Sequence, residues 1–443
     1  MEIKQFYDTN LAHASYAVLS ENQIALIDPA RDPEQYYKFA KENNAVITAV
    51  IETHPHADFV SSHLEISKST GAGIYVSRLL NPYYKFVPFD EGDELKIGSV
   101  FLIPLNTPGH SPDSISVIIR DEDGKDHAIA TGDTLFVGDV GRPDLREKAG
   151  SISKSRTDLA KMMYSTINEK LLKLPENILV YPAHGAGSLC GKATSTDTFS
   201  TIGREKKDNY ALQPMTEDTF VNVLLKDQPF IPKYFEYDVE LNRRGAPDFE
   251  ESINNVRRII TYNEIENGFI VIDTRSKADF DNGHFKGAVN LGDDRQFETW
   301  LGTIVSPLER YYLVSDTEFN LDNFIKRTAK IGYELLIEGA LVHKNSEGLI
   351  ISDSLDINIF MSDTDKFTLI DVRNKTEREN RNVFSNSLFI PLNELRERFS
   401  EIPAGKPVVV HCAAGYRSAA AASILRNLLD CKIYDLGEDV KIF

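Results

Sequence analysis

Cysteine is scarce in this chain, and the scarcity excludes one class of protein. Three thiols in 443 residues cannot form a disulfide framework, so each is judged as a free thiol whose reactivity depends on its surroundings. Long apolar runs are also absent, and the first residues lack the apolar core of a signal peptide. These absences predict a cytoplasmic protein that contacts no membrane.

Positive charge is the second shortage. Lysine and arginine number 49 against 67 aspartate and glutamate residues, which gives a formal net charge of −18. Nucleic-acid binding requires clustered basic side chains that neutralise phosphates, so nucleic acid is not an expected partner. Hydrophobic residues at 42% and charged residues at 26% are typical of a globular protein.

The length predicts two or three α/β domains. Short β-rich runs alternate with turn signals in the first two hundred residues. Strands are expected at residues 24–27, 46–51, 100–103, 115–119 and 178–181, and helices at residues 33–43 and 157–172. Residues 203–250 are polar and contain four prolines, which predicts a domain tail and linker that is helical in part.

The second half of the chain is an internal repeat. Residues 269–275, Phe-Ile-Val-Ile-Asp-Thr-Arg, match residues 367–373, Phe-Thr-Leu-Ile-Asp-Val-Arg, at an offset of 98 residues. Residues 311–316 match residues 407–412 in the same way, and Asp316 then stands in the place of Cys412. Two strand–helix units of about a hundred residues each follow, one with a nucleophile and one without.

The run Thr-His-Pro-His-Ala-Asp at residues 53–58 has the character of a metal site. It follows an apolar strand, so His54, His56 and Asp58 lie on a strand-to-helix turn. Phe59 comes next, where a further histidine would help to complete a second metal site. The motif therefore predicts a mononuclear centre.

Four more elements follow in order: Thr-Pro-Gly-His110, Thr-Gly-Asp133-Thr, Gly-Arg142-Pro-Asp and Tyr-Pro-Ala-His184. With this ordered set, residues 1–250 resemble the metallo-β-lactamase superfamily, which implies an αββα sandwich. Within it the chain is most similar to the persulfide dioxygenases. That resemblance implies one Fe(II) per chain held by His54, His110 and Asp133, a two-histidine, one-carboxylate set.

The same resemblance gives the other residues of the region supporting roles. His56, Asp58 and His184, which would hold metal in related thioester hydrolases, are expected to orient ligands or substrate. Arg142 either contacts the substrate, which we favour, or holds its loop. Cys190, six residues after His184, is either a thiol near the metal that carries sulfur or a buried apolar residue. His13 and His63 have no motif context and are expected to be structural.

The run His-Cys412-Ala-Ala-Gly-Tyr-Arg417-Ser lies between a strand and an alanine-rich helix. A cysteine at a helix N-terminus faces unpaired N–H groups, which favour the thiolate, and Arg417 adds a cation. This loop resembles the rhodanese family, whose cysteine carries sulfane sulfur as a persulfide. The earlier repeat keeps a rhodanese-like turn at residues 283–288 but is expected to be inactive.

The order of these three regions along the chain resembles that of the persulfide dioxygenase–sulfurtransferase fusions. It predicts an αββα domain at residues 1–250, followed by rhodanese-like domains with parallel sheets at residues 251–350 and 351–443. The resemblance implies oxidation of small thiol persulfides by O₂ to sulfite, which leaves as thiosulfate after transfer at Cys412. Two alternatives stay open: a binuclear thioester hydrolase of the glyoxalase II type, and a non-catalytic sulfur carrier. The sequence leaves the oligomeric state, including a homo-oligomer, undecided.

Overall fold

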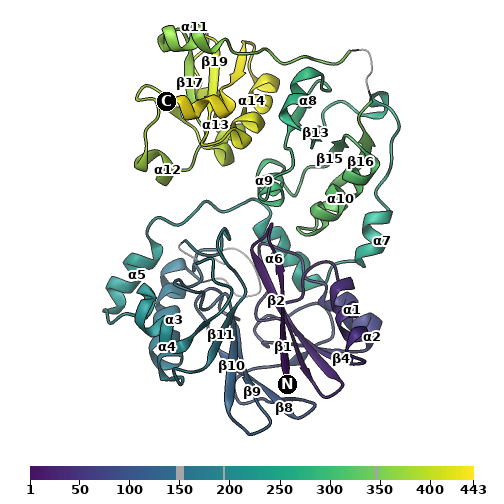
Figure 1. The fold of residues 1–443 in the computed structure, drawn as a ribbon, viewed down its shortest axis with the longest axis vertical. Helices are drawn as coiled ribbons and strands as arrows, with labels where there is room; N and C mark the ends of the chain where they lie inside the picture. The colour runs from purple at the N-terminus through teal and green to yellow at the C-terminus, as the bar shows by residue number, and fades with distance from the viewer. Residues whose placement is uncertain (146–153, 193–194, 345–347) are drawn as a thin grey trace. The chain divides into compact units, whose positions relative to one another are not determined.

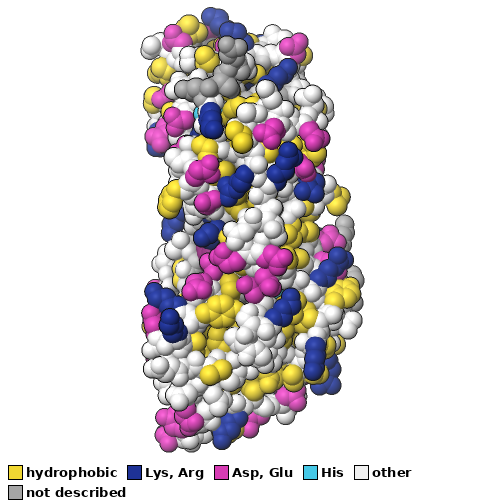
Figure 2. Space-filling model, turned by 90° about the vertical axis from the view of Figure 1, so that its right-hand side faces the viewer, with side chains coloured by type: hydrophobic (Ala, Val, Ile, Leu, Met, Phe, Trp, Pro, Cys, Tyr) yellow, Lys and Arg dark blue, Asp and Glu magenta, His cyan; other side chains and the backbone are white. Residues whose placement is uncertain are grey.

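The computed structural model describes residues 1–145, 154–192, 195–344 and 348–443, and the chain divides into two compact units (Figure 1). The first comprises Met1–Asn254 with Ala329–Gly332, and the second comprises Asn255–Thr328 with Tyr333–Phe443. Among the described residues, no helix is long and apolar enough to cross a membrane. Acidic and basic side chains are interspersed on the face shown in Figure 2.

The first unit contains two six-stranded sheets. The first sheet, in the order β1-β2-β3-β4-β5-β6, contains Glu2–Asp8, His13–Ser20, Gln23–Ile27, Val46–Ile51, Gly73–Val76 and Val87–Pro88. The second, in the order β12-β11-β10-β9-β8-β7, contains Ser200–Thr201, Leu179–Pro182, Asp126–Gly132, Ile115–Arg120, Val100–Asn106 and Leu95–Ile97. The predicted strands all appear among these, within a few residues of their expected ends.

Successive side chains of a strand point to opposite faces of its sheet, and here apolar side chains occupy both faces. Val18, Ile27 and Ile51 from the first sheet pack against Leu102 and Val117 from the second. The outer faces are covered by helices, which makes the αββα sandwich that the sequence predicts. These helices are α1 (Glu34–Glu42), α2 (His63–Thr70), α3 (Arg156–Glu169), α4 (Ile202–Asp208) and α5 (Glu217–Leu225).

The segment expected to be a tail and linker is largely helical and belongs to the first unit. Besides α4 and α5 it contains α6 (Phe235–Arg244) and α7 (Phe249–Asn254). Phe220 and Leu224 of α5 are buried in the core beside the second sheet. The prolines stand between the helices, and the stretch belongs to the first unit with more helix than the sequence predicts.

The second unit contains two parallel four-stranded sheets of identical topology. The first, in the order β14-β13-β15-β16, contains Ala288–Asn290, Ile270–Asp273, Tyr311–Ser315 and Ile337–Val342, with α8 (Lys277–Asn282), α9 (Phe297–Ile304) and α10 (Glu318–Ala329). The second, in the order β18-β17-β19-β20, contains Leu388–Phe389, Thr368–Asp371, Val408–His411 and Ile433–Asp435, with α11 (Ile357–Ser362), α12 (Lys375–Asn380), α13 (Leu395–Arg398) and α14 (Tyr416–Leu428). The repeat seen in the sequence is therefore a structural repeat.

Candidate metal centre and sulfur-transfer loop

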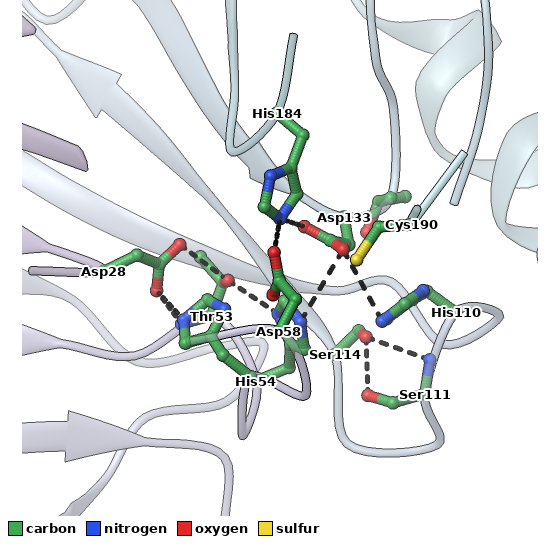
Figure 3. A network of polar contacts seen from close by, with 12 residues as sticks. Asp28, Thr53, His54, Asp58, His110, Ser111, Ser114, Asp133, His184 and Cys190 are labelled. Carbon is green, nitrogen blue, oxygen red and sulfur yellow. Dashed lines mark hydrogen bonds and ion pairs between the residues drawn. The ribbon is translucent and has the colours of Figure 1, made fainter. Parts of the chain in front are cut away.

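Two histidines and one aspartate form a buried cluster at the ends of the strands of the first unit (Figure 3). His54 follows β4, His110 follows β8 and Asp133 follows β10. Nε2 of His54 lies 3.9 Å, and Nε2 of His110 3.6 Å, from Oδ2 of Asp133. The structure thus brings together the three residues expected to hold iron, with one ligand atom of each within 4.8 Å of the others.

Hydrogen bonds fix which nitrogen each imidazole presents. The Thr53 hydroxyl donates to Asp28 at 2.8 Å, so its oxygen accepts the proton of His54 Nδ1 at 3.0 Å. His110 Nδ1 lies 3.0 Å from the carbonyl oxygen of Arg142, which can only accept. Both rings therefore carry their proton on Nδ1 and turn the lone pair of Nε2 toward Asp133, as metal-binding histidines do.

The Asp133 carboxylate fits a metal ligand. It is buried, and neither of its oxygens accepts a hydrogen bond in the described structure. Leaving a carboxylate buried without compensation costs several kcal/mol, which a bound cation would offset. Two neutral imidazoles and one carboxylate match the donor set of non-haem iron.

A second cluster adjoins the first. His184 Nε2 lies 3.3 Å from Oδ2 of Asp58 and 3.4 Å from Oδ1 of Asp133. Its Nδ1 donates to the Ala12 carbonyl at 3.2 Å, so the lone pair of Nε2 again faces the carboxylates. Cys190 completes the set, since one donor atom each of Asp58, His184 and Cys190 lie within 4.8 Å of one another (Figure 3).

The sequence led us to expect that Phe59, in place of a histidine, would leave the second cluster one donor short. The structure supplies a third donor from elsewhere. The ring of Phe59 packs against His13 at 3.8 Å and His56 at 4.3 Å between ring centroids. The third donor comes from Cys190 instead, on a loop more than a hundred residues away in the sequence. A thiol from a distant loop could not be assigned to this site from the local motif.

Cys190 is buried within the cluster, not at its entrance. Burial raises the pKa of its thiol well above the ordinary value, and the charges of Asp58 and Asp133 raise it further. The thiol is therefore protonated at neutral pH in the protein alone. A cation bound beside it would favour the thiolate, since a positive charge lowers a thiol's pKa.

His56 turns its Nε2 toward a pair of carboxylates outside the cluster of His54, His110 and Asp133. Its Nε2 lies 3.1 Å from Oδ1 of Asp28 and 3.3 Å from Oε2 of Glu52. Burial opposes its protonation, but the two carboxylates outweigh burial and hold the pKa of His56 well above its usual value. Because Asp28 also accepts from Thr53, which holds His54, His56 supports the metal centre through these partners.

Sequence reasoning missed several residues of this network. Asp28 and Glu52 lie outside the motif, and His63 proves to be buried 3.6 Å from Glu52. Asn242 of α6 donates to the carbonyls of His56 at 2.9 Å and Phe59 at 2.8 Å, so it holds the metal-binding loop. Asn242 lies in the segment expected to be a linker, which is why no motif pointed to it.

Arg142 holds its loop, which is the alternative that the sequence analysis did not favour, because its donors bind groups of the protein itself. Its guanidinium forms a two-pronged ion pair with Asp144 at 2.7 Å. The remaining donors bind the carbonyls of Leu189, Pro229 and Phe230. The side chain is 1% exposed, so it joins three loops and turns no donor to solvent.

In the second unit, Cys412 lies in the loop between β19 and α14. The backbone N–H of Gly415 donates to its sulfur at 3.1 Å, and Ser418 Oγ lies 3.5 Å away. Gly415 adopts a φ of 102°, and a Cβ there would lie 3.3 Å from the Gly437 backbone. The loop therefore curls tightly around the sulfur and turns the Gly415 N–H toward it.

Arg417, expected to be the cation of this loop, already has a partner. Its two terminal nitrogens donate to the Glu377 carboxylate of α12 at 2.6 and 2.7 Å. Burial opposes the charge of Arg417, but the carboxylate of Glu377 keeps the arginine pKa above its usual value, and the charge of Cys412 adds to this.

Comparison with known proteins agrees with both halves of this description. Residues 8–184 match the family model of the Metallo-beta-lactamase superfamily, and residues 359–442 match that of the Rhodanese-like domain. A "Probable metallo-hydrolase" of Bacillus subtilis is 31% identical over 39% of this chain and 84% of its own length. The mitochondrial persulfide dioxygenase of Bos taurus is 29% identical over 50% of this chain and 79% of its own length.

A solved structure covers more of the molecule. The crystal structure of a metallo-beta-lactamase from Staphylococcus aureus is 31% identical and has a TM-score of 0.68, covering 77% of this chain and 99% of that one. The family model for rhodanese matches the second repeat only. The chain therefore belongs to the metallo-beta-lactamase superfamily and carries a rhodanese domain in its C-terminal part.

Proposed function

We propose that the protein oxidises small thiol persulfides with O₂ at one Fe(II) and passes the product to Cys412. The observation that carries the proposal is the buried triad of His54, His110 and Asp133. Both imidazoles present Nε2 to a carboxylate that accepts no hydrogen bond from the residues that the structure describes. Similarity to a persulfide dioxygenase supports the same chemistry. A thiol persulfide anion, dioxygen and water would give thiol, sulfite and one proton.

Iron held by the triad would supply adjacent positions for dioxygen and a sulfur anion. The chain's own residues would hold the ligands in place, because Thr53 and the Arg142 carbonyl fix the two imidazoles. Burial of the triad excludes water, which strengthens the electrostatic interactions between ligands and cation.

The second step would take place at Cys412. A second thiol persulfide would first pass its outer sulfur to the Cys412 thiolate and leave as a thiolate, which gives a Cys412 persulfide. Sulfite would then attack the outer sulfur of this persulfide, the sulfur–sulfur bond would break, and the electron pair would return to the cysteine as thiolate while thiosulfate leaves. Fusing the two domains raises the effective concentration of sulfite at its acceptor. The thiolate requires a reducing compartment, so we propose a cytoplasmic location.

Metal content and oxygen uptake test the first step. Purified full-length protein should hold one iron per chain and consume O₂ with a thiol persulfide. Asp133→Ala should abolish both, while thiosulfate cleavage at Cys412 persists because it needs no metal. Two zinc ions per chain, together with cleavage of thioesters, would contradict the proposal.

A binuclear thioester hydrolase is the second candidate, and one observation favours it. Asp58, His184 and Cys190 form a second donor set, and His184 also lies 3.4 Å from Asp133, which could bridge two cations. Under the dioxygenase proposal, Phe59→His adds a donor without raising persulfide oxidation. Under the hydrolase alternative, Cys190→Ser lowers the metal content by one ion and removes thioester cleavage.

A further inference from the structure

Two arginines of the second repeat, Arg417 and Arg373, are each paired with a carboxylate. Arg417 binds Glu377 through two nitrogens, and Arg373 binds Asp371 at 2.9 and 2.7 Å. The sulfur itself receives the neutral N–H of Gly415. A site built to hold a doubly charged anion would be expected to keep an arginine fork free for it.

Glu377 is held from two sides, so its position is not that of a chance surface ion pair. Its Oε2 also accepts the backbone N–H of Asn374 at 3.0 Å, which makes it part of the capping box at the start of α12. Burial opposes its ionisation, but the hydrogen bonds and charge of Arg417 outweigh burial and lower the pKa of Glu377. The carboxylate is therefore an anion at neutral pH.

We propose that Glu377 is a positioning residue that weakens the binding of thiosulfate at the Cys412 loop and so favours its release. The inference rests on the proposed sulfur transfer at Cys412. Thiosulfate carries two negative charges and would share the Arg417 guanidinium with the Glu377 carboxylate, or displace it. The negative charge of Glu377 weakens the attraction of the loop for thiosulfate, and the same carboxylate holds Arg417 in a fixed orientation.

The transfer can be run in reverse to measure this binding. The Cys412 thiolate attacks the outer sulfur of thiosulfate, the sulfur–sulfur bond breaks, and sulfite leaves with the electron pair. Cyanide then removes the outer sulfur as thiocyanate and restores the thiolate. The KM for thiosulfate in this assay reports how well the loop accepts the dianion, and kcat reports the turnover.

Glu377→Gln removes the charge while its amide oxygen can still accept from Arg417. We expect the KM for thiosulfate to fall about three- to tenfold in the full-length variant, with kcat unchanged or lower, because a charge-assisted hydrogen bond becomes available to the substrate. Glu379→Gln is the matched control. Glu379 lies on the same helix, where it pairs with Lys375 at 3.7 Å and is 61% exposed, and the KM should not change.

A measurement on the unaltered protein is independent of how the variants fold. In the unaltered protein the charge of Glu377 balances that of Arg417, so this pair leaves little net charge for salt to screen. The KM for thiosulfate should therefore change less than about twofold between roughly 20 and 200 mM salt. A KM that rises or stays constant in Glu377→Gln would overturn the inference alone, as would a steep salt dependence of the unaltered protein. Absence of any thiocyanate formation by the unaltered protein would overturn the proposed role of Cys412 as well.

Discussion

The two repeats of the second unit share their frame and differ in one loop. In the first repeat Arg275 pairs with Asp273 and donates to the Gly283 carbonyl at 2.9 Å. In the second repeat Arg373 pairs with Asp371 and donates to the Arg381 carbonyl at the same distance. A buried ion pair that also binds the turn after the next helix is thus retained in both.

The difference lies after the third strand of each sheet. In the first repeat residues 316–317 connect β15 to α10, whereas residues 412–415 connect β19 to α14 in the second. Asp316 is exposed and accepts from Asn320 at 2.7 Å. Two residues leave no length for a loop that curls back on a sulfur atom. The first repeat therefore lacks both the cysteine and the loop that surrounds its sulfur in the second repeat.

The first repeat contacts the second beside the Cys412 loop. The Tyr416 hydroxyl, next to that loop, donates to the Gly292 carbonyl at 3.3 Å. Arg396 forms a two-pronged ion pair with Glu309 at 2.8 Å. The comparison teaches that the two repeats keep the same sheet and the same buried ion pair, and differ in the four-residue loop that begins at Cys412.

The largest expected effect is that of Cys412→Ser, which makes the second repeat resemble the first. Removing the nucleophile should lower thiosulfate–cyanide transfer by about 10³-fold or more. Oxygen uptake with a thiol persulfide should continue, and the product should change from thiosulfate to sulfite, as measured by chromatography of the reaction products. Cys431→Ser, at an exposed cysteine, is the control. Thiosulfate release at the unaltered rate would direct attention to Cys190.

Gly415→Ala should have the next largest effect, because it disturbs the curl and keeps the cysteine. An L-residue at a left-handed φ costs about 1–2 kcal/mol, and the added Cβ would lie 3.3 Å from the Gly437 backbone. We expect transfer to fall by roughly tenfold. Gly405→Ala is matched to it, with a φ of 104° and no atom within 4 Å of the new Cβ. The control should lose stability without losing transfer, and equal loss in both would refute the special role of the loop.

Tyr416→Phe tests the support between the repeats and should have a smaller effect. Loss of one hydrogen bond to Gly292 should lower the free energy of unfolding by about 1 kcal/mol. Denaturant titration measures this loss, while transfer should change less than about twofold because the Gly415 N–H still donates to the sulfur. An unchanged free energy of unfolding would mean that this contact between the repeats contributes nothing.

Much of this architecture could be predicted from the sequence, since strands such as residues 46–51 and the ordered metal motif carry strong local patterns. The candidate ligands His54, His110 and Asp133 and the Cys412 loop were proposed for the same reason. The partners of these residues could not be predicted, because they come from distant elements: Asn242 reaches the metal loop from α6, and Glu377 reaches Arg417 from α12. The position of Cys190, six residues after His184, suggested a thiol near the metal, but only folding shows that it joins Asp58 and His184.

The smallest expected effect is at Asp316, and it tests whether the first repeat lost its activity by one substitution or by loop length. Asp316→Ala removes an exposed hydrogen bond to Asn320, so transfer by Cys412 should not change and stability should fall by less than about 1 kcal/mol. Asp316→Cys, made together with Cys412→Ser, places a thiol at the equivalent position. Because α10 begins at Glu318, no loop can surround this thiol. Leu321 stands where the spacing of Cys412 and Arg417 would place an arginine, so the thiol has no neighbouring cation from that position. The double variant should form no thiocyanate, and recovery of transfer would show that the missing sulfur, not the shortened loop, silenced this repeat.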